Sequence, residues 1–136
     1  MDSKILNNIS RIIIPFIQIL GCYIILTGHL LPGGGFSGGT ILGCSFLIEK
    51  YFIGESSLLK YIEGSFGDNL LNIAMLSYIL LKLSTYVLGL HIDWREYGQI
   101  IGGGSILILN IVVGIVVALA LYKIIRFIGG DELARD

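Results

Sequence analysis

Four long apolar runs dominate this 136-residue chain and leave few folds open to it. A helix that crosses a bilayer needs about 20 mostly apolar residues, with a range of roughly 17–25. Each run is long enough to meet that requirement. We therefore predict an all-α membrane protein with four transmembrane helices, in a single domain that covers residues 1–136. The predicted spans are about 12–28, 36–53, 70–90 and 100–128.

The composition supports a membrane location. Hydrophobic residues make up 54% of the chain and charged residues only 14%, whereas a typical soluble domain is about 25% charged. The net charge of −1 argues against a nucleic-acid partner. The short polar start, residues 1–11, precedes a long apolar run without a small-x-small cleavage site, so we expect that run to be retained as the first membrane helix.

A glycine-rich stretch at residues 28–39, Gly-His-Leu-Leu-Pro-Gly-Gly-Gly-Phe-Ser-Gly-Gly, separates the first two runs. Pro32 lacks an N–H and disfavours helix in the residue before it, so the first helix should end here. The glycines that follow can adopt φ > 0 and allow a sharp turn. We predict a non-helical loop with His29 at its entrance. From the residues alone this is either a turn with a satisfied histidine, an anion cradle at a helix N-terminus, or a proton- or ion-linked site.

The two remaining links predict the orientation. Residues 54–69 are charged enough to be a solvated loop or a surface helix, and the Trp and Tyr of residues 91–99 suit a membrane–water interface. With four spans, one side collects seven basic residues and the other only Arg95, which favours cytoplasmic termini and an outward glycine loop. The seven are Lys4, Arg11, Lys50, Lys60, Lys123, Arg126 and Arg135.

Small residues recur every four positions in two of the runs, which places them on one face of each helix. Such stripes let helices approach closely, and we interpret them mainly as packing surfaces, with Gln18 and Asn110 as interhelical hydrogen-bonding groups. The second run has Gly35, Gly39 and Gly43, and the fourth has Asn110, Gly114 and Ala118.

Lys82 is the strongest polar outlier, because it falls near the middle of the third predicted span. A lysine there costs about 2.5–3.5 kcal/mol and should find protein or water. It is either part of an ion or proton relay, or it bonds to carbonyls or snorkels to the interface. Glu49 is a candidate partner by depth, although it also suits the cytoplasmic end of its own span.

No enzyme constellation accompanies these features. His29 and His91 lack clustered Asp, Glu or Cys at ligand spacing, and no nucleotide or iron–sulfur motif occurs. We therefore predict no catalytic residues, no metal site and no cofactor.

The motif Gly-His-x-x-Pro-Gly-Gly-Gly-Phe-x-Gly-Gly resembles the signature of the B subunit of multi-subunit sodium/proton antiporters of the Mrp, or Mnh, type. Similar subunits occur in membrane-bound hydrogenases and related ferredoxin-linked complexes. The chain length, the number of apolar runs and the Gly-Gly-Asp-Glu ending are also similar. The matching positions are Gly28, His29, Pro32, Gly33, Gly34, Gly35, Phe36, Gly38 and Gly39.

The resemblance implies an integral subunit of a cation/proton translocating module in the cell membrane. It would pack beside other Mrp-type subunits, including a large antiporter-like one, and act on sodium ions and protons. His29, Pro32 and Phe36 are the positions carried over, with His29 as a relay group. The pathway candidates are His29, Lys82 and Glu49. The alternatives are a purely structural helix-packing subunit or, less favoured, a small self-sufficient transporter.

One position departs from the antiporter pattern. Antiporter members resemble each other in having an acidic residue in the last span, where this chain has Asn110. The surrounding Gly102-Gly103-Gly104-Ser105 pattern is more similar to members found with membrane hydrogenases. The parent complex is therefore either a free antiporter or a redox-driven pump with hydrogenase or iron–sulfur subunits.

Overall fold

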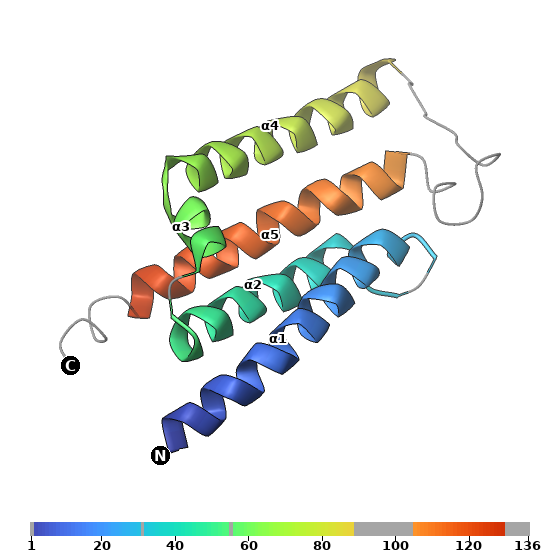
Figure 1. Ribbon diagram of the computed structural model, residues 1–136. Coiled ribbons are helices and arrows are strands. Elements are labelled where there is room, and N and C mark those ends of the chain that lie inside the picture. The colour runs from blue at the N-terminus through green and yellow to red at the C-terminus, as the bar shows by residue number, and fades with distance from the viewer. Residues whose placement is uncertain (1, 31, 55, 89–104, 130–136) are drawn as a thin grey trace.

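The computed structural model describes residues 2–30, 32–54, 56–88 and 105–129. These ranges form five α-helices (Figure 1), so the all-α prediction is confirmed for the described residues. The helices are α1 (Asp2–Thr27), α2 (Gly35–Phe52), α3 (Ser57–Glu63), α4 (Ser65–Leu88) and α5 (Ser105–Gly129).

Four long helices lie side by side, and the short α3 lies at one end of the bundle (Figure 1). The central helix is α2, which packs against α1 on one side and α5 on the other. On the far side of α5 lies α4, and α1 also contacts α5. The beginning of α1, the end of α5 and the α2–α4 connection all lie at the α3 end (Figure 1). The two described ends of the chain therefore lie at the same end of the bundle. Helices α1 and α4 start at this end, and α2 and α5 finish there.

The helices extend beyond the predicted apolar runs at their polar ends. Helix α1 begins at Asp2 rather than near residue 12, and α4 begins at Ser65 rather than at residue 70. Polar residues such as Asn, Lys and Ser can continue a helix out of an apolar segment at a modest cost in propensity. The predicted start of the fourth span, near residue 100, lies outside the described residues, which resume at Ser105 within α5.

Three of the helices are long and apolar enough to cross a membrane. They are residues Lys4–Thr27, Ser65–Val87 and Ile106–Gly129. The prediction of four spans is not confirmed, because α2 is not among them. It is the shortest of the four long helices, and its sequence includes four glycines and the Glu49–Lys50 pair.

The link between α2 and α4 is a short amphipathic helix at the surface, one of the two forms predicted for it. Ser56 caps α3 by accepting a hydrogen bond from the Leu59 backbone N–H at 3.3 Å. Leu59 and Ile62 turn inward, and both are buried. Together with Leu47, Leu119 and Tyr122 they form the hydrophobic core cluster at this end of the bundle.

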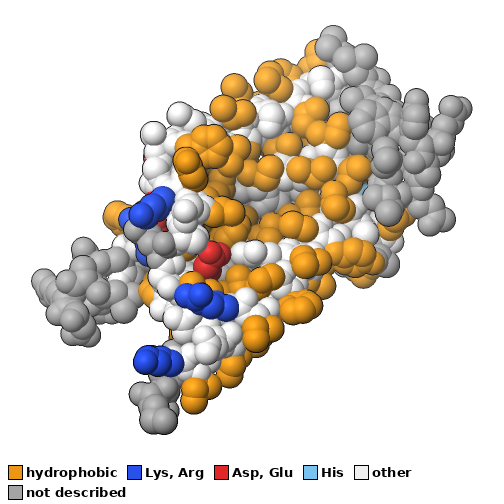
Figure 2. Space-filling model, in the orientation of Figure 1, with side chains coloured by type: hydrophobic (Ala, Val, Ile, Leu, Met, Phe, Trp, Pro, Cys, Tyr) orange, Lys and Arg blue, Asp and Glu red, His pale blue; other side chains and the backbone are white. Residues whose placement is uncertain are grey.

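Charged side chains gather at the same end. In Figure 2 the Lys and Arg side chains lie around α3 and the start of α1, while hydrophobic side chains cover most of the remaining described face. Large apolar side chains such as Phe16 and Tyr86 are exposed at 69% and 91%. A surface of this kind suits contact with lipid or with other membrane helices.

Candidate functional site

The link between α1 and α2 is closed by backbone contact. After α1 ends at Thr27, the Leu30 N–H donates to the Thr27 carbonyl at 2.8 Å. Gly33 and Gly34 then adopt positive φ values of 145° and 95°, which L side chains rarely adopt. A Cβ at Gly28 would collide with the Cα of Gly34, so the two ends of the link touch without side chains between them. The predicted turn is present, and glycine is required at these positions for steric reasons.

Asn110 of α5 lies against this link. A Cβ on Gly28 would be 3.0 Å from Asn110 Nδ2, and one on Gly34 would be 3.4 Å from Asn110 Oδ1. The Nδ2 atom is buried and has no hydrogen-bond partner among the described residues. Nδ1 of His29 is buried as well. The structure therefore brings His29 and Asn110, which are 81 positions apart in the sequence, to the same glycine link.

The other two motif residues face outward. Pro32 is exposed, and Phe36 is 70% exposed at the start of α2. An aromatic ring at that position is available to lipid or to another chain.

The two small-residue stripes meet along the whole α2–α5 seam. A Cβ at Gly39 would lie 2.6 Å from the Gly114 carbonyl oxygen, and one at Gly43 would lie 2.9 Å from the Ala118 oxygen. At Gly35 a Cβ would overlap the carbonyl oxygen of Asn110. Each contact joins residue i of α2 to residue i+75 of α5, so the helices run parallel and in register. Glycine at these positions allows a backbone separation that any side chain would prevent.

A second close contact joins α2 to α1, and the sequence reasoning did not single it out. A Cβ at Gly38 would lie 2.6 Å from Ile25 Cγ1 and 2.7 Å from the Gly21 carbonyl oxygen. Adjacent helical residues point about 100° apart, since a turn has 3.6 residues. Gly38 and Gly39 therefore face two different helices. The adjacent pair Gly38-Gly39 was the sequence signal for this second contact, because a single packing face of α2 would need only one of the two glycines.

The structure does not pair Glu49 with Lys82 and places Glu49 near the end of its own helix, which was the other interpretation of that residue. Glu49 accepts a hydrogen bond from Gln18 Nε2 of α1 at 3.3 Å, at the end of the bundle where α3 lies. Lys82 is exposed near the other end of α4. Because α5 lies between α2 and α4, the two side chains are separated both along and across the bundle. Lys82 is also not central in its helix, since α4 begins five residues earlier than predicted.

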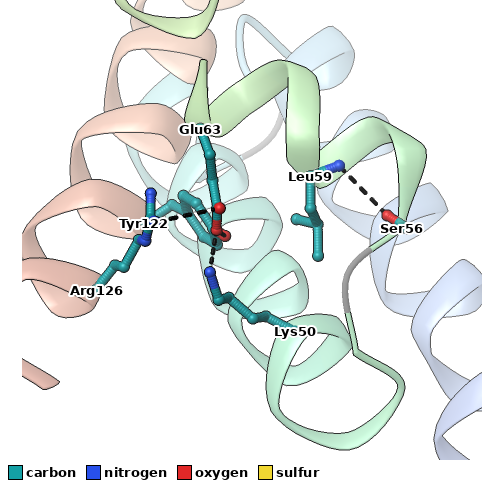
Figure 3. A network of polar contacts seen from close by, with 6 residues as sticks. All are labelled: Lys50, Ser56, Leu59, Glu63, Tyr122 and Arg126. Carbon is teal, nitrogen blue, oxygen red and sulfur yellow. Dashed lines mark hydrogen bonds and ion pairs between the residues drawn. The ribbon is translucent and has the colours of Figure 1, made fainter. Parts of the chain in front are cut away.

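A charge network that sequence reasoning missed holds the α3 end together (Figure 3). Glu63 Oε1, on α3, accepts hydrogen bonds from Lys50 Nζ of α2 and from the Tyr122 hydroxyl of α5, the latter at 2.5 Å. Its Oε2 lies 3.2 Å from Arg126 Nη2. Nearby, Lys123 of α5 forms an ion pair with Asp68 of α4. Three helices therefore meet at one carboxylate, whose side chain is only 10% exposed.

Opposing effects determine the pKa of Glu63. Burial raises the pKa, but the hydrogen bonds from Lys50 and Tyr122 and the positive charges of Lys50 and Arg126 lower it. The net pKa lies below the ordinary value for a glutamate, so Glu63 is ionised at neutral pH. Glu63 joins α3 to α2 and α5. The sequence signal for the helical link that carries it was Ser56, a helix-capping residue, followed by the apolar pair Leu59 and Ile62.

His91 and Gly102–Gly104 lie outside the described residues. Among the residues that are described, no group of three His, Cys, Asp or Glu side chains gathers as a metal site would require.

These features define a class of protein. Three long apolar helices, an exposed apolar surface and a glycine-packed central helix are those of a multi-pass integral membrane protein whose helices associate through backbone contact. Residues 5–123 match the family described as a domain related to the MnhB subunit of Na+/H+ antiporter. The chain therefore belongs to the MnhB family, as its motif indicated.

Individual relatives agree with this assignment. The chain is 31% identical over 107 residues to an uncharacterized protein, MJ1307, of Methanocaldococcus jannaschii, covering 71% of this chain and 40% of that protein. It is 29% identical over 65 residues to a Staphylococcus epidermidis protein named "Putative antiporter subunit mnhB2", covering 48% and 46%. A Staphylococcus aureus protein of the same name is 24% identical over 85 residues, covering 62% and 60%. The chain spans less than half the length of the first two.

Proposed function

We propose that this chain is a membrane subunit of a multi-subunit cation/proton translocating module of Mrp type, with sodium ions and protons as its cargo. The observation that carries the proposal is the MnhB family match over residues 5–123, whose signature motif forms the glycine link. In this role the chain is a transporter component and has no catalysis of its own. Its partners are other Mrp-type subunits, including a large antiporter-like one.

The proposed relay residue is His29. A histidine titrates near neutral pH and can pass a proton between partners. It lies at the link where Asn110 also brings a buried polar group. Lys82 and Glu49 remain pathway candidates, but as separate sites near opposite ends of the bundle. Pro32 and the glycines hold the link in shape, and Phe36 faces a neighbour.

The alternative is a purely structural subunit, and the glycine seams favour it as strongly as they favour transport. Helices α1, α2 and α5 meet through backbone contacts that need no ion pathway. A chain with these seams would place partner helices beside one another without contributing ionisable groups.

Substitution of His29 distinguishes a subunit that takes part in proton transport from a purely structural subunit. In the intact complex, His29→Ala and His29→Gln should abolish sodium-dependent proton transport while the other subunits still co-purify. Leu30→Ala is the matched control, since Leu30 is the next residue of the link and is 51% exposed. Full transport by both His29 variants with normal assembly would support the structural alternative.

Asn110 favours a second kind of parent complex for the same subunit. It replaces the carboxylate of antiporter-type members with a neutral amide, so the fourth span would carry no titratable group there. We propose a ferredoxin-driven, hydrogenase-type complex as this parent complex. Mass spectrometry of the complex purified under mild conditions distinguishes the two. Iron–sulfur or nickel–iron subunits support the redox-driven pump, and antiporter-like subunits alone support the secondary antiporter.

Both termini are proposed to be cytoplasmic. The basic side chains at the α3 end support this orientation, because basic residues concentrate on the cytoplasmic side. By their places in the helices (Figure 1), those described toward that end are Lys4, Arg11, Lys50, Lys60, Lys123 and Arg126.

A further inference from the structure

Lys82 lies within the apolar part of α4, five residues before the candidate span ends at Val87. It follows Asp68, which belongs to the charged α3 end, by fourteen residues, or about 21 Å of helix. It precedes Leu88, where the described helix ends, by six residues, or about 9 Å. The candidate span continues through Val87, so Lys82 falls within it.

The direction of the side chain makes this position harder to solvate. In an α-helix each Cα–Cβ bond tilts toward the helix N-terminus. Helix α4 starts at the α3 end, so the Lys82 side chain starts out toward the middle of the bundle. To snorkel to the nearer surface it would have to reverse that direction. A charged group in such a place is stabilised best by an opposite charge.

The described carboxylates of this chain cannot supply that charge. Glu49, Glu63 and Asp68 all lie at the α3 end. They are engaged there with Gln18, Lys50 and Lys123 respectively, and Asp68 is about 21 Å from Lys82 along α4. A second copy of the chain inserted in the same orientation would present these carboxylates at the same wrong level.

An apolar groove lies on the same side of α4 as Lys82, one helical turn before it. It has a volume of about 340 Å³ and lies between α4 and α5, lined by Met75, Tyr78, Ile79, Val113 and Val116. Lys82 follows Tyr78 by four residues and Ile79 by three, so all three share one edge of α4. The described residues therefore offer an apolar groove, with the Lys82 cation one helical turn beyond its lining. Together these fit an apolar helix that carries one acidic residue.

We propose that this groove receives a transmembrane helix of a partner subunit, and that this helix carries an Asp or Glu that pairs with Lys82. The inference rests on the proposed function, because it requires a partner subunit in the membrane. It assigns Lys82 to the assembly of the complex. The binding energy comes from packing along the groove, and the ion pair sets the depth at which the partner helix docks.

A membrane-permeant carbodiimide tests the pairing directly in the purified complex. The reagent joins an amine to a nearby carboxylate as an amide and leaves as the urea. Mass spectrometry should find Lys82 linked to an Asp or Glu within a predicted span of another subunit. A link from Lys82 to Asp93 or Glu96 of this chain, or no link at Lys82, would overturn the proposal.

Co-purification of charge variants gives a second measurement. Lys82→Met should reduce the amount of the linked partner by about tenfold or more, because its carboxylate is left buried and unpaired. Lys82→Arg should retain it. Lys4→Met is the matched control, since Lys4 is exposed at the α3 end. Normal co-purification with Lys82→Met would contradict the pairing while leaving the proposed function intact, whereas a wild-type chain without antiporter-like subunits would refute both.

Discussion

The positions of α2 and α4 in the bundle are the reverse of what their suitability as membrane spans suggests. Helix α2, with four glycines and a Glu49–Lys50 pair, is not among the candidate membrane spans, yet it lies between α1 and α5. Helix α4 meets the requirements for a membrane span, yet only 6% of its apolar segment is buried inside the structure. Apolar character therefore does not decide which helix is central.

The reason lies in what drives helix association in lipid. Lipid tails are as apolar as leucine, so burying a leucine against another helix gains little, and association depends on close packing. Gly35, Gly39 and Gly43 let the backbone of α2 approach that of α5, and Gly38 does the same toward α1. The described part of α4 has Gly67 and Ala74 as buried small residues but no stripe at four-residue spacing, and much of its surface remains available to lipid or to partners.

The largest expected effect comes from enlarging the α2–α5 seam. In Gly39→Leu the new side chain would start 2.6 Å from the Gly114 carbonyl oxygen, so the helices must separate. We expect a loss of about 3 kcal/mol or more in the free energy of unfolding, at or beyond the upper end of ordinary overpacking. Thermal unfolding in detergent measures the change. Cys44→Leu is the control, because Cys44 is exposed on the same helix, and equal stability of the two variants would contradict the backbone contact.

A smaller effect is expected at the charge network. Glu63→Gln removes the negative charge that Lys50 and Arg126 share, and we expect a loss of about 2 kcal/mol. The control is Asp68→Asn, which breaks the Lys123 ion pair at a carboxylate that is 66% exposed. An exposed pair contributes about 0–1 kcal/mol. If the two variants were equally stable, Glu63 would not hold the helices together.

The pH dependence identifies the ionised carboxylate as the source of this stability. The pKa of Glu63 is lowered in the folded state, and the ordinary value for an unfolded glutamate is about 4.3. The stabilisation is therefore fully present above pH about 4.3 and is lost as the pH falls through the folded-state pKa. The stability difference between wild type and Glu63→Gln should be constant from pH 6 to 8 and shrink in acid. A difference that persisted unchanged in acid would point to packing instead.

The smallest effect is expected on the exposed surface of α4. Leu80 is 56% exposed, so Leu80→Ala should change the free energy of unfolding by less than about 0.5 kcal/mol. The matched buried change is Leu119→Ala on α5, where Leu119 is 4% exposed and the expected loss is about 2–5 kcal/mol. Similar losses for both, again by thermal unfolding in detergent, would show that α4 is packed more tightly than its exposure indicates.

Much of the fold could be predicted from local pattern. Apolar length predicted the three helices that qualify as spans, and Pro32 with the following glycines predicted the break after Thr27. The four-residue spacing of Gly35, Gly39 and Gly43 indicated one packing face and Asn110, Gly114 and Ala118 another. These features follow from the sequence because helical geometry relates residues three and four apart, whatever lies around them.

Tertiary structure alone decided which faces meet and which charges pair. Nothing local indicates that the two stripes join with an offset of 75 residues, or that Gly38 faces α1 while Gly39 faces α5. Depth along the sequence suggested that Glu49 could reach Lys82, but α5 separates their helices, and Gln18 is the partner of Glu49. Glu63 contacts residues up to 63 positions away, on two other helices. Such contacts depend on how the helices are placed around one another, and the sequence of one helix does not specify which other helices pack against it.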